Sequence, residues 1–149
     1  MYSWAVGRVV RFLYEKVSAG DLRLPLLGLA KDARFVFPGS SSFGGERRGK
    51  AAIAAWMRRF ASLRPEFIVE DVAVAGPPWN MRVFLRFRDR IVASNGYVYE
   101  NAGMEYIGIR WGLIREIRVH LDTEKVAALD VQLGPAGEVE PRDAVREVI

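Results

Sequence analysis

The chain of 149 residues contains no cysteine and only one histidine. The lack of cysteine excludes disulfides, thiol nucleophiles and thiolate metal sites, and it fits a reducing, cytoplasmic location, which we expect for this protein. His120 has no second histidine or cysteine near it, so it is a weak candidate for a metal ligand or a base, and we expect it at the surface or in an interface. The sequence therefore implies neither a metal nor a cofactor.

Long hydrophobic runs are also lacking, since no apolar stretch approaches the roughly 20 residues that a membrane-spanning helix needs. At the N-terminus the charges are scattered among apolar residues, which makes a poor signal peptide. The net charge of +4 comes mainly from arginine, but the arginines are spread along the chain and form no run. We therefore expect neither a membrane nor a nucleic-acid partner, and we interpret the arginines as solvated or ion-paired.

What is present is enough apolar sequence for a full core, because half of the residues are hydrophobic and 27% are charged. The length fits one domain. Apolar residues recur three or four positions apart in segments 2–17 and 50–63, which predicts helices, and a shorter helix follows Asp21. Segment 33–37 is typical of a short strand. Segment 38–49 is rich in glycine and serine, and we interpret it as a flexible surface loop beside a pocket mouth.

The most informative stretch is 82–122, which predicts three successive strands joined at Asn95-Gly96 and Trp111-Gly112. Asn-Gly is a strong hairpin signal, because a tight mirror-type turn needs two residues that accept positive φ. Helices followed by a strongly curved antiparallel sheet form a cone with an open mouth, large enough for a small molecule. A last short helix is expected to begin after Asp122, which would cap it.

Two strings within this pattern carry a resemblance to known proteins. One is DARFVFPG, followed by a glycine-rich loop and GKAAIAAW, and the other is GMEYIGIRWGLIREIRVHLD. With the order of helices and strands, they resemble the nuclear-transport-factor-2-like superfamily, and within it the SnoaL-like polyketide cyclases and their relatives ketosteroid isomerase and limonene epoxide hydrolase. The resemblance implies an α+β cone, a curved and mostly antiparallel sheet wrapped by three N-terminal helices, over residues 1–130. Residues 131–149 would form a C-terminal tail.

The same resemblance implies that several catalytic groups of these relatives are missing. The general-base aspartate of the isomerase corresponds to Phe37, and the two residues that hold water in the hydrolase correspond to Phe35 and Phe37. In the hydrolase's Arg-x-Asp, Arg82 matches the arginine and Phe84 replaces the aspartate, while a second aspartate falls on Val119. Epoxide hydrolysis needs one group to accept a proton and another to donate one, so we expect neither this reaction nor the isomerase route.

One acid does match the isomerase. Glu105 corresponds to a protonated aspartate that donates a hydrogen bond to an oxyanion, and burial in an apolar cone would raise its pKa. Glu105 is therefore the first candidate for a functional acid, with Arg82 as an orienting cation. The alternative is an ion pair with Arg86, which the Asn-Gly turn would place opposite Glu105, and such a pair would keep the pKa of Glu105 low.

The strand that begins near Met81 admits two registers. Strict alternation places the apolar row from Met81 to Phe87 toward the core and the arginines in water. The resemblance instead turns Arg82 and Phe84 inward and leaves the Met81 row on the convex face. Such an apolar face would need a cover, so we expect a homodimer that packs sheet against sheet through the convex face.

Two functions remain open at this point. The cone could bind a small apolar molecule that carries a carbonyl or hydroxyl group, and an enzyme of this kind would be a cofactor-independent isomerase or cyclase acting by proton transfer. Alternatively, the domain could be a non-catalytic dimerisation or protein-interaction module with its cone filled by its own side chains. A cavity of a few hundred Å³ without an arginine bonded to Glu105 favours the first function. The expected lining residues are Phe35, Phe37, Trp56, Phe84, Val119 and Leu121, with Arg82, Asn101 and Glu105 as the polar contacts.

Overall fold

The computed structural model describes residues 2–134, and its elements follow the order expected from the sequence. The predicted tail therefore lies outside the described residues from position 135 on. The helices are α1 (Tyr2–Ser18), α2 (Arg23–Leu27), α3 (Lys50–Ser62) and α4 (Thr123–Leu133). The strands are β1 (Leu29–Phe37), β2 (Gly45–Arg48), β3 (Glu66–Ala75), β4 (Met81–Val92), β5 (Val98–Arg110) and β6 (Leu113–Leu121).

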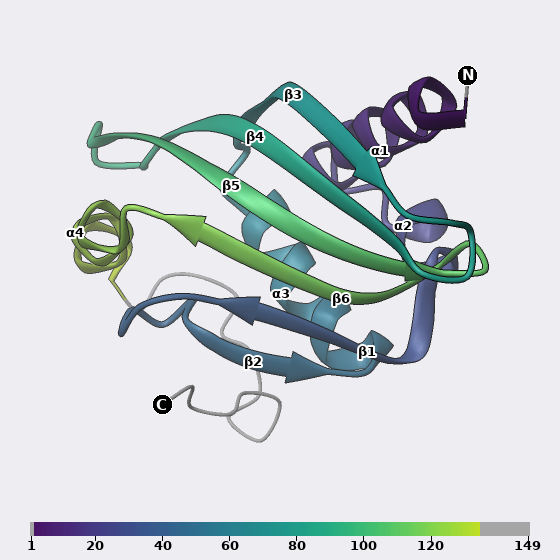
Figure 1. Ribbon diagram of the computed structural model, residues 1–149. Helices are drawn as coiled ribbons and strands as arrows, with labels where there is room; N and C mark the ends of the chain where they lie inside the picture. The colour runs from purple at the N-terminus through teal and green to yellow at the C-terminus, as the bar shows by residue number, and fades with distance from the viewer. Residues whose placement is uncertain (1, 135–149) are drawn as a thin grey trace.

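The six strands form one twisted sheet in the order β2-β1-β6-β5-β4-β3. Neighbouring strands are antiparallel except β1 and β6, which are parallel. In Figure 1, α3 lies behind the sheet, α1 and α2 lie toward one end of it and α4 toward the other. The α+β fold expected from the sequence is confirmed: helices cover the inner face of a curved, mostly antiparallel sheet, and the three N-terminal helices precede the long hairpins.

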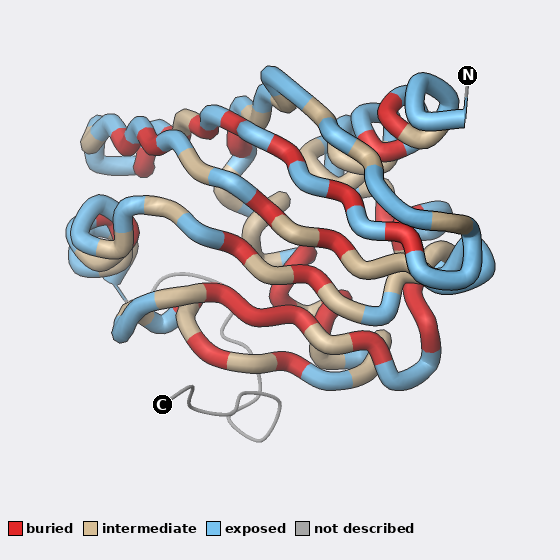
Figure 2. Tube along the Cα trace, in the orientation of Figure 1, coloured by how far each residue is buried: buried red, intermediate tan, exposed pale blue. Residues whose placement is uncertain are grey.

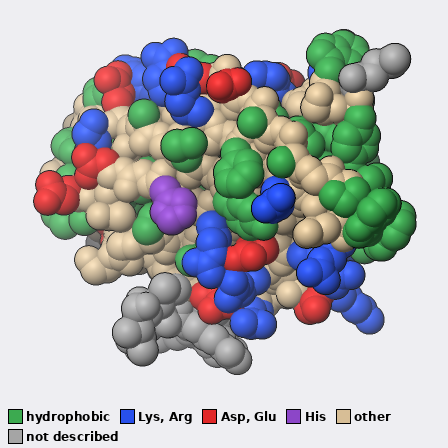
Figure 3. Space-filling model, in the orientation of Figure 1, with side chains coloured by type: hydrophobic (Ala, Val, Ile, Leu, Met, Phe, Trp, Pro, Cys, Tyr) green, Lys and Arg blue, Asp and Glu red, His purple; other side chains and the backbone are tan. Residues whose placement is uncertain are grey.

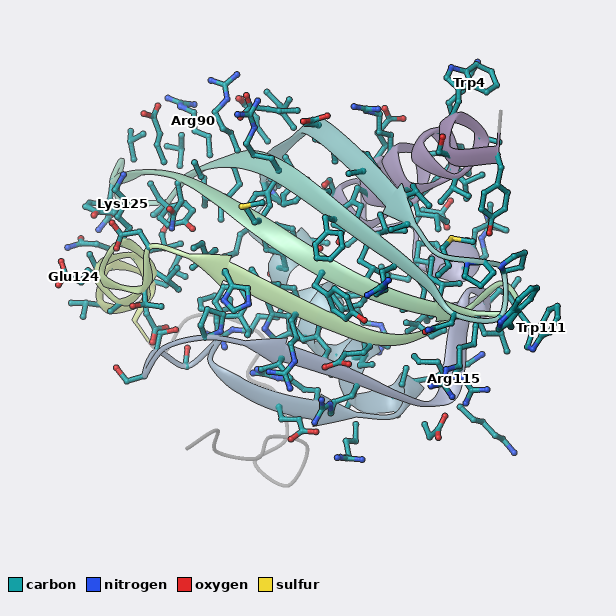
Figure 4. All side chains as sticks on the ribbon, in the orientation of Figure 1. Trp4, Arg90, Trp111, Arg115, Glu124 and Lys125 are labelled. Carbon is teal, nitrogen blue, oxygen red and sulfur yellow. The ribbon has the colours of Figure 1, made fainter. Side chains whose placement is uncertain are left out.

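Both predicted turns form, but the tight two-residue turn lies at Trp111-Gly112 and not at Asn95-Gly96. In the first turn, Gly96 has a positive φ of 87° and Asn95 does not, so this is not the tight mirror-type turn that was expected. Asn95 instead accepts a hydrogen bond through Oδ1 from the backbone N–H two residues later, at 3.0 Å. Trp111 and Gly112 have φ values of 51° and 80° and form the tight two-residue turn, from which the Trp111 side chain projects into solvent (Figure 4).

The register of β4 is the one that plain alternation predicts. The residues Met81, Val83, Leu85 and Phe87 are buried, while Arg82 is exposed. Figure 2 shows buried and exposed positions alternating along the central strands. The inward placement of Arg82 and Phe84 that the resemblance implied is therefore wrong. Each buried apolar side chain contributes about 1.5–3 kcal/mol, whereas an inward Arg82 would lose the hydration of its guanidinium.

The segment between β1 and α3 is more ordered than a flexible surface loop. Gly45–Arg48 pairs with β1 as strand β2, and Phe43 before it is buried. Arg47 has an exposed fraction of 0%, and its Nη1 donates hydrogen bonds to the carbonyl oxygens of Phe43 (2.6 Å) and Gly45 (3.4 Å). Arg47 is thus not one of the solvated arginines, because backbone carbonyls replace the water around its guanidinium.

The last strand and the last helix follow expectation. His120 is exposed on β6, on the face opposite the core. Asp122 caps α4, since its Oδ1 accepts hydrogen bonds from the backbone N–H groups of Glu124 (3.0 Å) and Lys125 (3.3 Å), both labelled at the start of that helix in Figure 4. None of the described helices combines the length and the hydropathy needed to span a membrane.

Candidate functional site

A cavity of about 410 Å³ lies between the inner face of the sheet and helices α1, α2 and α3. This volume falls in the range of small-molecule pockets. Exposed lining residues, such as Tyr2, Val9 and Gly112, belong to α1 and to the β5–β6 turn. The cavity therefore opens between α1 and this turn. The wall is apolar except for the side chains of two tyrosines, Tyr2 and Tyr14, and two acids, Asp89 and Glu105.

Aromatic rings form one wall. The Trp56 ring lies 4.5 Å from the ring of Phe35 and 5.3 Å from that of Phe37, measured between centroids. Its indole Nε1 donates a hydrogen bond of 3.1 Å to the carbonyl oxygen of Phe43, so the orientation of the ring is set by the segment before β2. The expected lining residues that border the cavity are Phe35, Phe37, Trp56, Val119 and Leu121.

Glu105 enters the cavity from β5, at the centre of the sheet. It is 6% exposed, and its Oε2 accepts a hydrogen bond from the hydroxyl of Tyr14 on α1. Burial raises the pKa of Glu105 to about 8, because the charged carboxylate would be poorly solvated. The carboxyl group is therefore mostly protonated at neutral pH and can act as a hydrogen-bond donor.

The ion-pair alternative for Glu105 is wrong. Glu105 lies opposite Leu85 in the β4–β5 register, whereas Arg86 lies opposite Met104 and points to the other face. There the guanidinium of Arg86 approaches Glu70 at 4.0 Å. The expected pair fails because residues one position apart on a strand point to opposite faces.

Tyr14 is a part of the site that the sequence did not indicate. Its ring stacks on Phe67 of β3, with centroids 5.0 Å apart and planes inclined by 9°. This stacking orients the hydroxyl toward Glu105, although 91 residues separate the two positions. Sequence alone shows Tyr14 only as an aromatic residue on the apolar face of a helix.

Asp89 is the second buried acid, and it was also missed. It occupies an inward position of β4, continues the row of Met81 and Phe87, and is 7% exposed. Burial raises the pKa of Asp89 to about 7, and the nearby Tyr99 hydroxyl offsets only part of this rise. Its Oδ1 has no hydrogen-bond partner among the described residues. An acid in the apolar half of an alternating strand was the signal that could have identified it.

Three predicted contact residues do not border the cavity. Arg82 and Phe84 lie on the outer face of β4, and Phe84 is 42% exposed. Asn101 is buried but turned to other partners: its Nδ2 donates to the hydroxyl of Tyr99 (3.0 Å) and to the backbone oxygen of Asp122 (2.9 Å). Within residues 2–134, no group of three or more histidines and acids is arranged to hold a metal ion.

Comparison with known proteins identifies the fold. No protein-family model and no curated protein matches the sequence. Bal32a, from a soil-derived mobile gene cassette, superposes with a TM-score of 0.76 at 18% identity, covering 86% of this chain and 98% of that protein. An NTF2-like protein of unknown function from Burkholderia pseudomallei K96243 superposes with a TM-score of 0.72 at 22% identity, over 83% and 95%.

A third similar structure is a putative SnoaL-like polyketide cyclase from Jannaschia sp. CCS1, with a TM-score of 0.66 and 19% identity over 87% of this chain and 92% of that one. These similarities confirm that the chain has the nuclear-transport-factor-2-like fold. At such identities they show the fold alone, because this architecture carries many unrelated activities.

Proposed function

We propose that the protein binds a small, largely apolar molecule that carries a carbonyl or hydroxyl group, as the SnoaL-like resemblance implies. The observation that carries the proposal is a buried carboxyl group, with its pKa raised to about 8, on the wall of an otherwise apolar cavity of about 410 Å³. The apolar wall supplies affinity through burial of the ligand surface. Glu105 supplies orientation, as the few polar groups of small-molecule pockets do.

Glu105 would act on the ligand as a hydrogen-bond donor. Because the Tyr14 hydroxyl donates to Oε2, the carboxyl proton resides on Oε1, which is left to contact the ligand oxygen. In an apolar site, this donor stabilises negative charge on the carbonyl oxygen of a ligand. The reaction class that we propose is cofactor-independent isomerisation or cyclisation by proton transfer, with Glu105 as the acid. Arg82 has no role in it, because Arg82 lies on the outer face.

The competing function, a non-catalytic interaction module, requires a cone filled by its own side chains and Glu105 held by an arginine. The cavity and the hydrogen bond between Tyr14 and Glu105 do not support it. The ligand-binding function is therefore the one that the geometry favours.

The first test compares naphthalene with 2-naphthol, two probes that differ only in a hydroxyl group. We expect 2-naphthol to bind about tenfold more tightly near pH 6, because one hydrogen bond to Glu105 contributes about 1.4 kcal/mol. The difference should disappear in Glu105→Leu, which retains the apolar volume. Titration followed by quenching of tryptophan fluorescence measures both affinities.

Arg82→Ala is the matched control for this experiment. It removes a charge from the outer face of β4 and should leave both affinities unchanged. Equal binding of the two probes to the unmodified protein, or a tenfold preference that survives in Glu105→Leu, contradicts the proposed function.

We also propose that the protein forms a homodimer through the outer face of the sheet. Figure 3 shows hydrophobic side chains near the middle of this face, with charged side chains around them. Phe84 and Met104 are largely exposed there, and the Phe84 ring packs against Tyr106 with centroids 5.4 Å apart. This outer patch is smaller than the one expected from the resemblance, because the Met81 row is buried inside the cone.

The dimer is tested by sedimentation velocity. Phe84→Glu places a charge at the centre of the outer patch and should convert the dimer into a monomer, because burying an unpaired carboxylate costs several kcal/mol. Val131→Glu, at an exposed position on α4, is the control and should leave the dimer intact. A monomeric unmodified protein, or an intact dimer in Phe84→Glu, argues against this interface.

A further inference from the structure

Asp89 lies at the end of the cavity far from the opening, and one of its carboxyl oxygens is unpaired. The residue borders both the main cavity and a smaller one of about 30 Å³ behind it. Oδ1 is buried without a hydrogen-bond partner among residues 2–134. An unpaired buried carboxyl oxygen is costly, so the carboxyl group has few interactions of its own. Because the Asp89 side chain also borders the cavity, its other oxygen is the one that a ligand would contact.

A chain of hydrogen bonds lies beside the Asp89 carboxyl group and orients the neighbouring Tyr99 hydroxyl. The Tyr99 hydroxyl, which is close enough to Asp89 to lower its pKa slightly, accepts a hydrogen bond from Asn101 Nδ2, at 3.0 Å. The same Nδ2 donates to the backbone oxygen of Asp122 at 2.9 Å, at the start of α4. Asn101 therefore orients the Tyr99 hydroxyl beside Asp89, which is the kind of supporting contact that a binding group needs.

The distance between the two acids defines the length of a ligand that could contact both. Glu105 lies opposite Leu85, and Asp89 is four residues further along β4. At about 3.3 Å per residue, the backbone positions of the two acids are roughly 13 Å apart along the strands, and side chains that stand perpendicular to the sheet keep their carboxyl groups at about this separation. One hydrogen bond of about 2.7 Å at each end leaves about 8 Å for the ligand, which is the span of a molecule with two fused rings.

The sheet between the acids is apolar and closely packed. Gly103 lies opposite Phe87, and a Cβ atom at position 103 would come within 2.7 Å of Cζ of the Phe87 ring. The phenylalanine ring thus packs directly on the backbone of β5. A ligand that reaches from Glu105 to Asp89 would cross this surface without meeting another polar side chain among the described lining residues.

We propose that Asp89 is a second polar anchor of the cavity, which accepts a hydrogen bond from a hydroxyl group at the inner end of the ligand. The preferred ligand is then an elongated apolar molecule with hydrogen-bonding groups at opposite ends: an oxygen that accepts from Glu105 and a hydroxyl that donates to Asp89. This inference rests on the proposed ligand-binding function at Glu105 and specifies the class of ligand.

The experiment adds naphthalene-2,6-diol to the two probes used above. The ratio of the dissociation constants of 2-naphthol and the diol isolates the contribution of the second hydroxyl group. We expect the diol to bind about tenfold more tightly near pH 8, and the ratio to be smaller near pH 6, because an ionised carboxylate accepts the stronger hydrogen bond. Burial raises the pKa of Asp89 to about 7, so the change should be centred near that pH.

Other titratable groups should not change this ratio. Those lining the two cavities within the described residues are Tyr2, Tyr14, Tyr99 and Glu105. 2-Naphthol and the diol contact Glu105 in the same way. Titration of Glu105 therefore affects the two dissociation constants equally and leaves their ratio unchanged. The ratio therefore reports on Asp89.

Two substitutions complete the test. In Asp89→Leu the diol should lose its advantage over 2-naphthol, and in Asp89→Asn, which keeps an acceptor oxygen, the advantage should lose its pH dependence. Naphthalene, which needs neither acid, shows that each variant keeps the cavity. Asp71→Asn, at an exposed position on β3, should behave like the unmodified protein.

The outcomes separate the two proposals. Equal affinity for 2-naphthol and the diol, or an advantage of the diol that persists in Asp89→Leu, overturns the role of Asp89 and leaves the role of Glu105 standing. If 2-naphthol binds no better than naphthalene, the proposed function fails, and the assignment of Asp89 fails with it.

Discussion

The free energy of unfolding is expected to fall by several kcal/mol as the pH rises from about 5 to about 9. The cause is that the folded protein holds two protons that the unfolded chain releases at lower pH. Burial raises the pKa of Glu105 from 4.5 to about 8 and that of Asp89 from 3.8 to about 7. Because the folded state binds more protons, the stabilisation is fully present below the pKa values of the unfolded chain. It is lost as the pH rises through the pKa values of the folded protein.

The two acids contribute comparable amounts. Each integer of pKa difference corresponds to about 1.4 kcal/mol, so the values for Glu105 imply about 5 kcal/mol and those for Asp89 about 4 kcal/mol. Most of the loss should occur between about pH 5 and about pH 8, before Glu105 is fully ionised in the folded state. Above that range the folded protein carries buried charge, and the slope should level off.

Urea unfolding over this pH range measures the effect. Glu105→Gln should flatten the dependence, because glutamine does not ionise, and Asp89→Asn should flatten its lower part. Glu100→Gln on the same strand is the control, since the Glu100 side chain is 70% exposed, and it should keep the slope of the unmodified protein. A slope that is unchanged in Glu105→Gln would show that Glu105 is ionised in the folded state near neutral pH.

Arg47→Ala is expected to lower the free energy of unfolding by about 3–5 kcal/mol. The Arg47 guanidinium is fully buried and donates hydrogen bonds to the carbonyl oxygens of Ser42, Phe43 and Gly45. Alanine would remove one donor from each of these acceptors, although Trp56 still donates to Phe43 and Arg59 to Ser42, and it would leave a void in place of the buried side chain. Because Trp56 donates to the same carbonyl oxygen of Phe43, the aromatic wall of the cavity should loosen as well.

The adjacent arginine provides the control. The Arg48 side chain is 55% exposed and forms an ion pair of 3.0 Å with Glu46 on the outer face. Such surface pairs contribute about 0–1 kcal/mol, so Arg48→Ala should have little effect on urea unfolding. Similar losses in the two variants would mean that the buried hydrogen bonds of Arg47 do not stabilise this segment.

Much of the fold could be predicted from local patterns. The apolar spacing of 2–17 and 50–63 matches α1 and α3, and the alternation after residue 81 matches β4. These signals are reliable because burial of one face of a helix or strand leaves a period that is visible along the chain. Segment 38–49 was misinterpreted, because its glycines and serines indicate a loop, while Phe43 is held by Trp56 of α3 and Gly45–Arg48 pairs with β1.

The candidate site was predicted only in part. Glu105 was identified through its position before the final hairpin, and its burial follows from the inward row of β5. Arg82 and Phe84 were placed inside by analogy with relatives, whereas the alternation within their own strand indicated the outer face. Asp89 was not predicted, although it is the one acid at an inward position of β4, because the alternation of that strand was interpreted from its apolar residues and arginines.

The sequence by itself determined the long helices and strands, their order and the alternating rows along the strands, because these depend on periodicity and on turn residues close together in the chain. Only the tertiary structure decided what the inward residues meet. The hydrogen bonds between Tyr14 and Glu105 and between Asn101 and Asp122 join residues that no local pattern relates. Hydrogen bonds of this kind depend on how the helices close over the curved sheet, and the same closure leaves the cavity between them.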